Sequence, residues 1–264
     1  MNTSKKIVIL LIAALVLSCP VAWSAEPVCG AKSGVVFVVG GVGGVDPLQS
    51  WAQVTLPLAG VPHEVRVFEW THSKFRYLRD LQDTRYLKEK AADLAAQVMA
   101  VKAEDASRPV FLMGHSAGAA LVLEAAGELP PGTLDRLIVL SAAVSPEYDL
   151  RPALRATRGE VVSFNSPLDR FMLSFGTSFF GTVDRYYVNA AGMEGFKAPD
   201  DLDEDGRRLY SRLVQSAWSA DMLFERGCLH NSTCMPLFLG RQVTPWLTRP
   251  LDCNPSAQLP VLLP

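Results

Sequence analysis

A single serine lies between two glycines in the segment GHSAG, residues 114–118. Gly-x-Ser-x-Gly is weak evidence by itself, because glycine and serine are common residues. Its setting is more specific, since an apolar strand-like run at 110–113 precedes it and an alanine-rich run at 117–127 follows it. A strand that enters a helix through a tight, strained turn presents the serine hydroxyl above the sheet. The pattern predicts that Ser116 is a nucleophile, and a serine that only caps the helix is the alternative.

A nucleophilic serine needs a base, and histidine is the usual one. The four histidines of the chain are His63, His72, His115 and His230. In proteins with this kind of turn the base follows the serine, in a loop near the C-terminus, and only His230 does so. His115 lies inside the turn, where its side chain would point away from the Ser116 hydroxyl. We expect His230 to be the base, and an ordinary surface histidine is the alternative.

The third catalytic group should be a carboxylate that orients the histidine and follows a late strand. Asp169 comes just after the strand-like run at 159–166 and fits this position. Asp184 and the acidic run at 200–205 are its rivals, although the first lies in or beside a strand-like piece and the second has the composition of a solvated loop. The sequence therefore favours Asp169.

Two backbone amides are expected to bind the negative charge that develops on the substrate oxygen. The N–H of Ala117 is one, because it begins the helix after Ser116. The glycine-rich segment 40–44 supplies the other, with Gly41 or Val42 as the donor. A phosphate-binding loop is excluded, because the segment lacks a Gly-Lys-Ser/Thr ending and does not match Gly-x-Gly-x-x-Gly.

Alternating strand-like and helix-like patterns surround these residues. The mostly apolar strand patterns predict an α/β fold, with a mostly parallel sheet covered by helices on both faces. Strands are expected at 34–41, 63–70, 110–113, 135–143 and 159–166, with another strand-like piece near 183–188. Helices are expected at 85–102, 117–127, 207–222 and 236–247, the last interrupted or ended at Pro245.

The first residues have the layout of a secretory signal peptide: two lysines, an unbroken apolar run at 7–17, then small residues. Cleavage after Ser24 would leave a single domain at 25–264, exported and without a membrane span, because the apolar run is short for crossing a bilayer. A lipid anchor at Cys19 is the alternative, although the residues around it are a poor lipoprotein box.

Four cysteines remain after such a cleavage, and an even number in an exported chain suggests disulfide bonds. The cysteines are Cys29, Cys228, Cys234 and Cys253. The first could pair with the last and the middle two with each other, but three pairings are possible. No metal site or cofactor is expected, because no further metal ligands cluster near these cysteines.

The chain has 264 residues, of which 49% are hydrophobic and 20% charged, which is globular composition. Its formal net charge of −2 gives no basic surface for nucleic acid. Oligomeric state is not indicated by any of these features.

Several segments resemble the α/β-hydrolase superfamily, namely the glycine-rich loop, GHSAG at 114–118, SPLD at 166–169 and the late His230. GHSAGAALVLEAAGELP, VLSAAVSPEYDL and FGTVDRYYVNAAGMEGF are more narrowly similar to exported bacterial hydrolases of this fold. The resemblance implies a serine hydrolase with Ser116, Asp169 and His230 as its triad. The oxyanion segment departs from it, because it lacks the His-Gly motif of many lipases.

The reaction expected from these residues is acyl transfer on a small molecule, with a carboxylic ester as the first choice. Thioesters, lactones and peptides remain open, because the same triad serves all of them. The aromatic stretch 171–196 either shapes an apolar acyl pocket or belongs to the core. A binding or surface protein that kept the fold and lost turnover is the alternative function.

Overall fold

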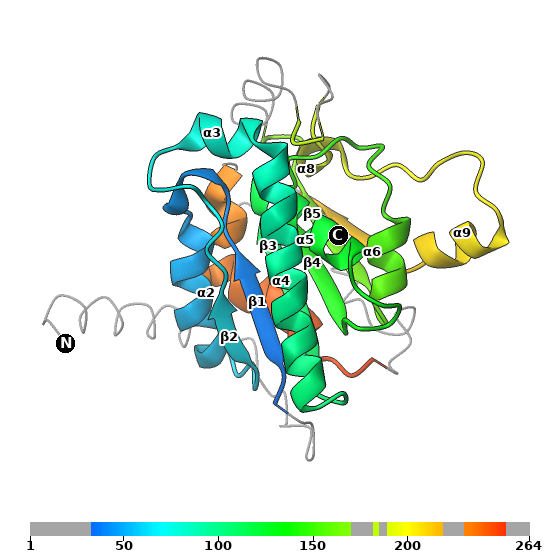
Figure 1. Cartoon of the computed structure of the whole chain (residues 1–264), viewed down its shortest axis with the longest axis horizontal. Helices are drawn as coiled ribbons and strands as arrows, with labels where there is room; N and C mark the ends of the chain where they lie inside the picture. The colour runs from blue at the N-terminus through cyan, green and yellow to red at the C-terminus, as the bar shows by residue number, and fades with distance from the viewer. Residues whose placement is uncertain (1–32, 170–181, 185–188, 219–229, 252–264) are drawn as a thin grey trace, which may run out of the picture.

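Six parallel strands form one sheet in the order β2-β1-β3-β4-β5-β6. This is a computed structural model, and it describes residues 33–169, 182–184, 189–218 and 230–251. The strands are β1 (Val35–Val39), β2 (Glu64–Val67), β3 (Val110–His115), β4 (Arg136–Leu140), β5 (Val161–Asn165) and β6 (Leu213–Ala217). Figure 1 shows them as one twisted layer behind α4 and α5.

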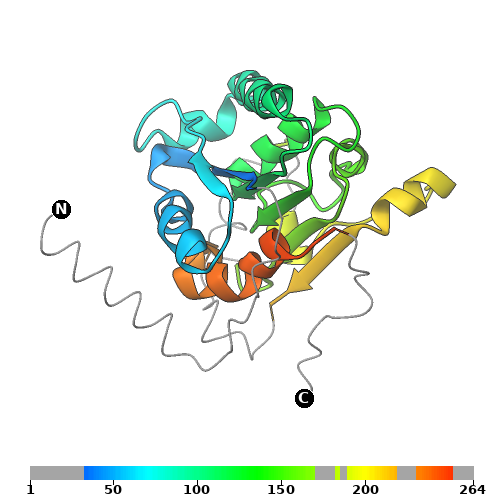
Figure 2. The same ribbon diagram turned by 90° about the horizontal axis from the view of Figure 1, so that it is seen from below.

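Helices cover both faces of this sheet, and the two layers are clearest in Figure 2. On one face, α4 (Thr84–Glu104), α5 (Ala117–Gly127) and α6 (Arg151–Ala156) bury their apolar sides against the strands. On the other face lie α2 (Pro47–Leu58) and a C-terminal helical segment made of α11 (Pro236–Phe238), η5 (Leu239–Val243) and α12 (Thr244–Thr248). The predicted fold class is confirmed.

The central strands are mostly apolar along their length, because both of their faces are buried. All side chains of β1, β3, β4 and β5 are buried. This explains why continuous apolar runs located these strands in the sequence. The predicted helix at 85–102 is confirmed as α4, whose buried positions repeat at helical spacing.

The helix expected at 207–222 is wrong over Leu213–Ala217, which form a strand, and residues 219–222 lie outside the described residues. α9 (Glu204–Tyr210) ends early, and β6 follows and pairs with β5 from Val161↔Leu213 to Asn165↔Ala217. β6 is an edge strand whose residues are half-buried or exposed, so it carries no apolar run. Between α9 and β6, the guanidinium of Arg212 donates a 2.6 Å hydrogen bond to the Leu154 carbonyl of α6. Backbone pairing along the sheet has overridden the local helical pattern.

The C-terminal segment 236–248 does not stop at Pro245. Residues Leu239–Val243 form a wider π-helical turn, and Pro245 then lies in the first turn of α12, where its missing N–H loses nothing.

The short helices α3 (Tyr77–Gln82) and α8 (Ala191–Glu194) and the 3-10 turns η1 (Val42–Gly44) and η4 (His230–Cys234) complete the elements. Residues 185–188 of the strand-like piece near 183–188 lie outside the described residues, as do the signal segment and most of 171–196. Among the residues the structure describes, none of the helices is long and apolar enough to cross a membrane.

Candidate active site

Ser116 occupies a strained turn between β3 and α5. Its backbone angles are φ 56° and ψ −122°, which a residue with a side chain adopts only under constraint. The turn is held by hydrogen bonds from Ser116 N to the Leu140 carbonyl (3.0 Å) and from Ala143 N to the Ser116 carbonyl (3.1 Å). A Cβ on Gly118 would lie 2.3 Å from the Gly40 carbonyl oxygen, so only glycine allows α5 to pass so close to β1. The sequence pattern has the local geometry that a nucleophile elbow requires.

His230 and Asp169 lie together at the carboxyl edge of the sheet. His230 Nδ1 is 2.7 Å from Asp169 Oδ2, and both side chains are buried. Asp169 follows β5 in a turn closed by its own N–H to the Ser166 carbonyl. Its Oδ1 is buried without a hydrogen-bond partner among the described residues. The carboxylate is therefore committed to the imidazole.

The rival carboxylates are used elsewhere. Asp184 accepts hydrogen bonds from the Ser145 N–H and hydroxyl. Asp203 caps α9 through Gly206 N, and Asp205 pairs with Arg208. Of the acids weighed in the sequence, the structure brings Asp169 to His230.

His230 is held beside the elbow by His115. The two imidazole rings have centroids 4.7 Å apart, and His115 Nε2 is 3.3 Å from the His230 carbonyl oxygen. The structure has no hydrogen bond between the Ser116 hydroxyl and the His230 ring, two residues that it describes. Such contacts are often loose before substrate binds and tighten in the complex.

The glycine-rich loop after β1 has two of its amides occupied by buried carboxylates. Gly41 N donates to Asp46 Oδ2 and Gly43 N to Asp80 Oδ2, both at 2.8 Å. A Cβ built on Gly41 would lie 3.2 Å from Ser116 Cβ, so the loop runs directly beside the elbow. The Gly41 N–H already donates to Asp46. Of the two loop amides considered as donors to the substrate oxygen, we therefore retain that of Val42. Ala117 begins α5, where an amide has no acceptor within the helix.

Asp46 and His115 form a second His–Asp pair, which the sequence patterns did not reveal. His115 Nδ1 is 2.6 Å from Asp46 Oδ2, and both side chains are buried. Burial opposes charge on each, but their mutual attraction is stronger: it raises the pKa of His115 well above its usual value and lowers that of Asp46 to about 2.

Cys234 completes this cluster, with Sγ 3.9 Å from Asp46 Oδ1. The ligand atoms of Asp46, His115 and Cys234 lie within 4.8 Å of one another, close enough for a metal ion. However, both ring nitrogens of His115 face acceptors, a carboxylate and a carbonyl, so both carry hydrogens and neither has a lone pair for a metal. Burial also raises the pKa of the Cys234 thiol. The geometry accounts for the three side chains as a hydrogen-bonded cluster.

The predicted Cys228–Cys234 disulfide is not found, because Cys234 is a free and fully buried thiol. Its side chain belongs to the buried cluster that contains the apolar side of α2. Cys29, Cys228 and Cys253 lie outside the described residues, and the pairing of Cys29 with Cys253 stays a prediction.

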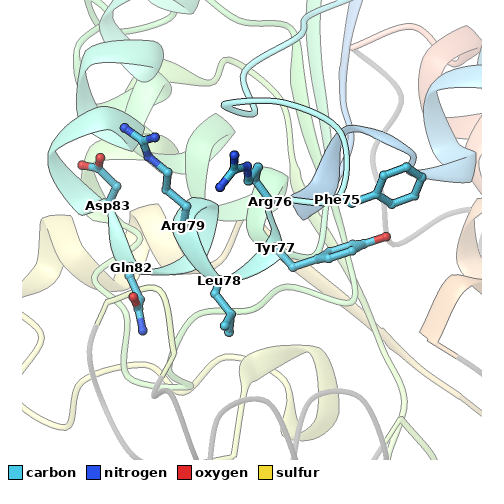
Figure 3. A pocket seen from close by; sticks show the side chains of 7 residues that line it. All are labelled: Phe75, Arg76, Tyr77, Leu78, Arg79, Gln82 and Asp83. Atoms are coloured by element: carbon cyan, nitrogen blue, oxygen red, sulfur yellow. The ribbon is translucent and has the colours of Figure 1, made fainter.

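An open pocket of about 790 Å³ lies beside the glycine-rich loop, and Figure 3 shows the seven side chains around it. Phe75, Tyr77 and Leu78 are its apolar part and are exposed by 68%, 42% and 51%. The Tyr77 ring packs against Gly43 so closely that a Cβ there would lie 2.2 Å from a ring carbon. Tyr77, one of the residues that line the pocket, therefore lies against the loop that carries Val42.

Comparison with known proteins adds one family match. Residues 83–168, about a third of the chain, match the Hydrolase_4 family model, described as serine aminopeptidase, S33. No curated protein is similar enough in sequence to count as a match.

Solved structures with a similar fold are distant. One is TT1662 from Thermus thermophilus, with 16% identity, a TM-score of 0.45, and coverage of 84% of this chain and 92% of that one. Another is a cutinase-like protein from Cryptococcus sp., with 12% identity, a TM-score of 0.44, and coverage of 82% and 93%. A third is a predicted CIB-like hydrolase from Thermoplasma acidophilum, with 12% identity, a TM-score of 0.45, and coverage of 83% and 88%. At such TM-scores these likenesses are too distant to inform function.

The parallel sheet and the family match confirm the resemblance to the α/β-hydrolase superfamily that the sequence motifs indicated. The matched segment contains β3, the Ser116 turn, β4 and β5, and ends one residue before Asp169. At the coarser level, the match indicates a hydrolase.

Sequence reasoning missed Asp46 and Asp80, the two acids that hold the glycine-rich loop. The sequence pattern around Asp46 could have located it. Aspartate followed by proline is typical of a helix start, where the carboxylate accepts hydrogen bonds from the first backbone N–H groups. Its side chain does accept from Leu48 N at the start of α2. Asp80 had no local signal: it lies on α3 and also accepts from the backbone N–H and the Nδ1 of His72.

Proposed function

We propose that this protein is a serine hydrolase that cleaves carboxylic esters through Ser116, His230 and Asp169. The observation that carries the proposal is the 2.7 Å contact between His230 and Asp169 at the same sheet edge as the strained Ser116 turn. A carboxylate on Nδ1 fixes the imidazole with Nε2 available as the base. His230 and Asp169 are 61 residues apart in the chain, and their contact is the histidine–carboxylate pairing that a serine triad requires.

In the proposed reaction the Ser116 hydroxyl attacks the ester carbonyl while His230 Nε2 takes its proton. The oxygen that becomes negative accepts hydrogen bonds from the amides of Ala117 and Val42. The imidazolium then gives its proton to the alcohol as the C–O bond breaks, which leaves an acyl-serine. Water, deprotonated by His230, attacks this ester and releases the acid and the free serine.

The apolar side chains of Phe75, Tyr77 and Leu78 would receive part of the substrate, because they adjoin the loop that binds the oxyanion. Phe75 has a positive φ of 66°, and its N–H donates to the Gly43 carbonyl. The hydrogen bond ties the backbone of Phe75 to the glycine-rich loop, and its side chain is exposed. Most of the stretch 171–196, the other candidate for the acyl pocket, lies outside the described residues.

The direct test is steady-state hydrolysis of p-nitrophenyl esters from acetate to decanoate, with aminoacyl p-nitroanilides as the peptide arm. We expect ester turnover by the wild type and its loss in Ser116→Ala. Turnover of the anilides alone would replace the ester assignment by a peptidase. No turnover of either class, with no labelling by an acylating probe, would favour the binding protein that lost activity.

Export is part of the proposal and rests on the N-terminal sequence pattern alone. Expression of the full chain in a bacterial host, followed by N-terminal sequencing of the mature protein, tests it. A start at Ala25 supports the signal peptide, and a lipidated start at Cys19 would replace it by an anchored form.

A further inference from the structure

We propose that the Asp46–His115 ion pair is a positioning device that holds the oxyanion loop, the nucleophile turn and the His230 loop in one arrangement. The inference rests on the proposed function. It gives a role to a buried charge pair that does not itself touch the reacting atoms.

The geometry makes His115 a cation. Nδ1 faces the Asp46 carboxylate at 2.6 Å and Nε2 faces the His230 carbonyl oxygen at 3.3 Å. Neither partner has a hydrogen to donate, so both nitrogens must carry one. An imidazolium that is only 1% exposed needs a counter-charge, and Asp46 supplies it.

Each end of the pair controls a different catalytic segment. Asp46 accepts from Gly41 N at 2.8 Å and from Leu48 N at 2.9 Å, which ties the residue before Val42 to the start of α2. His115 is the residue before Ser116, so the position of its ring and that of the serine are set by one backbone turn. Its Nε2 then reaches across to the backbone of His230, 115 residues along the chain.

Among the described residues, few other titratable groups contact the His115 imidazolium. Asp46, at the start of α2, is its counter-charge. From η4 the imidazolium meets the His230 ring and the Cys234 thiol. Asp169 is directed at His230 Nδ1. The pairing raises the pKa of His115 and lowers that of Asp46, so it favours the charged form of both side chains.

Loss of the ion pair is expected to shift the three segments by about 1 Å. Such a shift should lower turnover by about 10²-fold, because the oxyanion amides and the His230 imidazole must be aligned on one ester group. Binding of the ester should change much less, since the apolar pocket at α3 is not held by His115. The expected pattern is therefore a fall in kcat with a nearly constant KM.

The experiment compares His115→Ala with His63→Ala in the full mature protein. His63 is a matched control, because its ring also joins two backbone groups: Nδ1 accepts from Gly34 N at 2.9 Å, and Nε2 donates to the Leu247 carbonyl at 2.8 Å. Both variants should lower the melting temperature. Only His115→Ala should lower kcat, by about 10²-fold, whereas His63→Ala should stay within about twofold of the wild type.

Equal kcat for folded His115→Ala and the wild type would overturn the proposal. If His115→Ala does not fold, Asp46→Asn takes its place, because the amide oxygen can still accept from Leu48 N while the charge is lost. A second readout is independent of activity: ¹⁵N-detected NMR should find both ring nitrogens of His115 protonated at pH 7. One unprotonated nitrogen at pH 7 would also overturn the proposal.

The two proposals fail in different ways. Wild-type protein that does not hydrolyse any ester or label at Ser116 contradicts the function. Active wild type together with an active, folded His115→Ala contradicts only the positioning role.

Discussion

The two ends of the sheet each hold a histidine with both ring nitrogens in hydrogen-bond contact, but the two histidines carry different charges. At the amino end, His63 receives a hydrogen bond from Gly34 N and is therefore neutral. At the carboxyl end, His115 faces a carboxylate and a carbonyl and is therefore charged. Burial lowers the pKa of His63, while Asp46 overcomes burial and raises that of His115. The difference shows that, of these two histidines, the one beside the Ser116 turn is paired with a buried carboxylate.

The largest expected effect comes from the carboxylate of the proposed triad. Asp169→Asn should lower kcat by about 10⁴-fold, because an amide no longer stabilises the imidazolium and favours the wrong tautomer. Ester hydrolysis at saturating substrate measures it. Asp184→Asn is the control, since that carboxylate binds Ser145 instead, and it should keep kcat within about threefold of the wild type. A larger loss of kcat in Asp184→Asn than in Asp169→Asn would show that Asp169 is not the acid of the triad.

Removal of one amide N–H should have the next largest effect. Val42→Pro deletes the proposed oxyanion donor at the first residue of η1, a position where proline fits because Gly41 before it is extended. We expect kcat to fall by about 10²–10³-fold. Val42→Ala keeps the N–H and should retain nearly full activity. Equal losses in both variants would mean that the side chain, not the amide, matters.

The opposite charges of the two histidines predict opposite pH dependences of stability. The folded protein favours neutral His63, so its stabilisation is complete above pH 6.5 and is lost as the pH falls towards its lowered pKa. The folded protein favours charged His115, so its stabilisation is complete below pH 6.5 and is lost only as the pH rises through its raised pKa.

Thermal melts between pH 8 and pH 5 measure this difference. On acidification, the advantage of the wild type over His63→Ala should shrink, while its advantage over Asp46→Asn should grow, each by a few degrees in Tm. Changes of the same sign for both variants would contradict the charge assignment of one histidine.

The smallest expected effect concerns the apolar pocket at α3. Leu78→Asp should lower kcat/KM for longer acyl esters relative to the acetate, by no more than about fourfold for each methylene that contacts the pocket. Arg85→Asp, at an exposed position of the next helix, is the control. A uniform effect on all chain lengths would exclude the pocket as the acyl site.

The central strands and the Ser116 turn could be predicted because local sequence determines them: a strand buried on both faces is an apolar run, and the elbow follows one. β6 could not, since an edge strand is half solvated and its residues also fit a helix. The meeting of His230 with Asp169 could be predicted from chain order and strand position. The Asp46–His115 pair could not, because its partners are 69 residues apart and neither type is unusual at its position.

The most direct test of the account is covalent labelling with a fluorophosphonate, followed by peptide mass mapping. The account predicts one adduct per chain on Ser116, absent in Ser116→Ala and formed much more slowly in His230→Ala. Labelling at another residue, or equal labelling of wild type and Ser116→Ala, would contradict it.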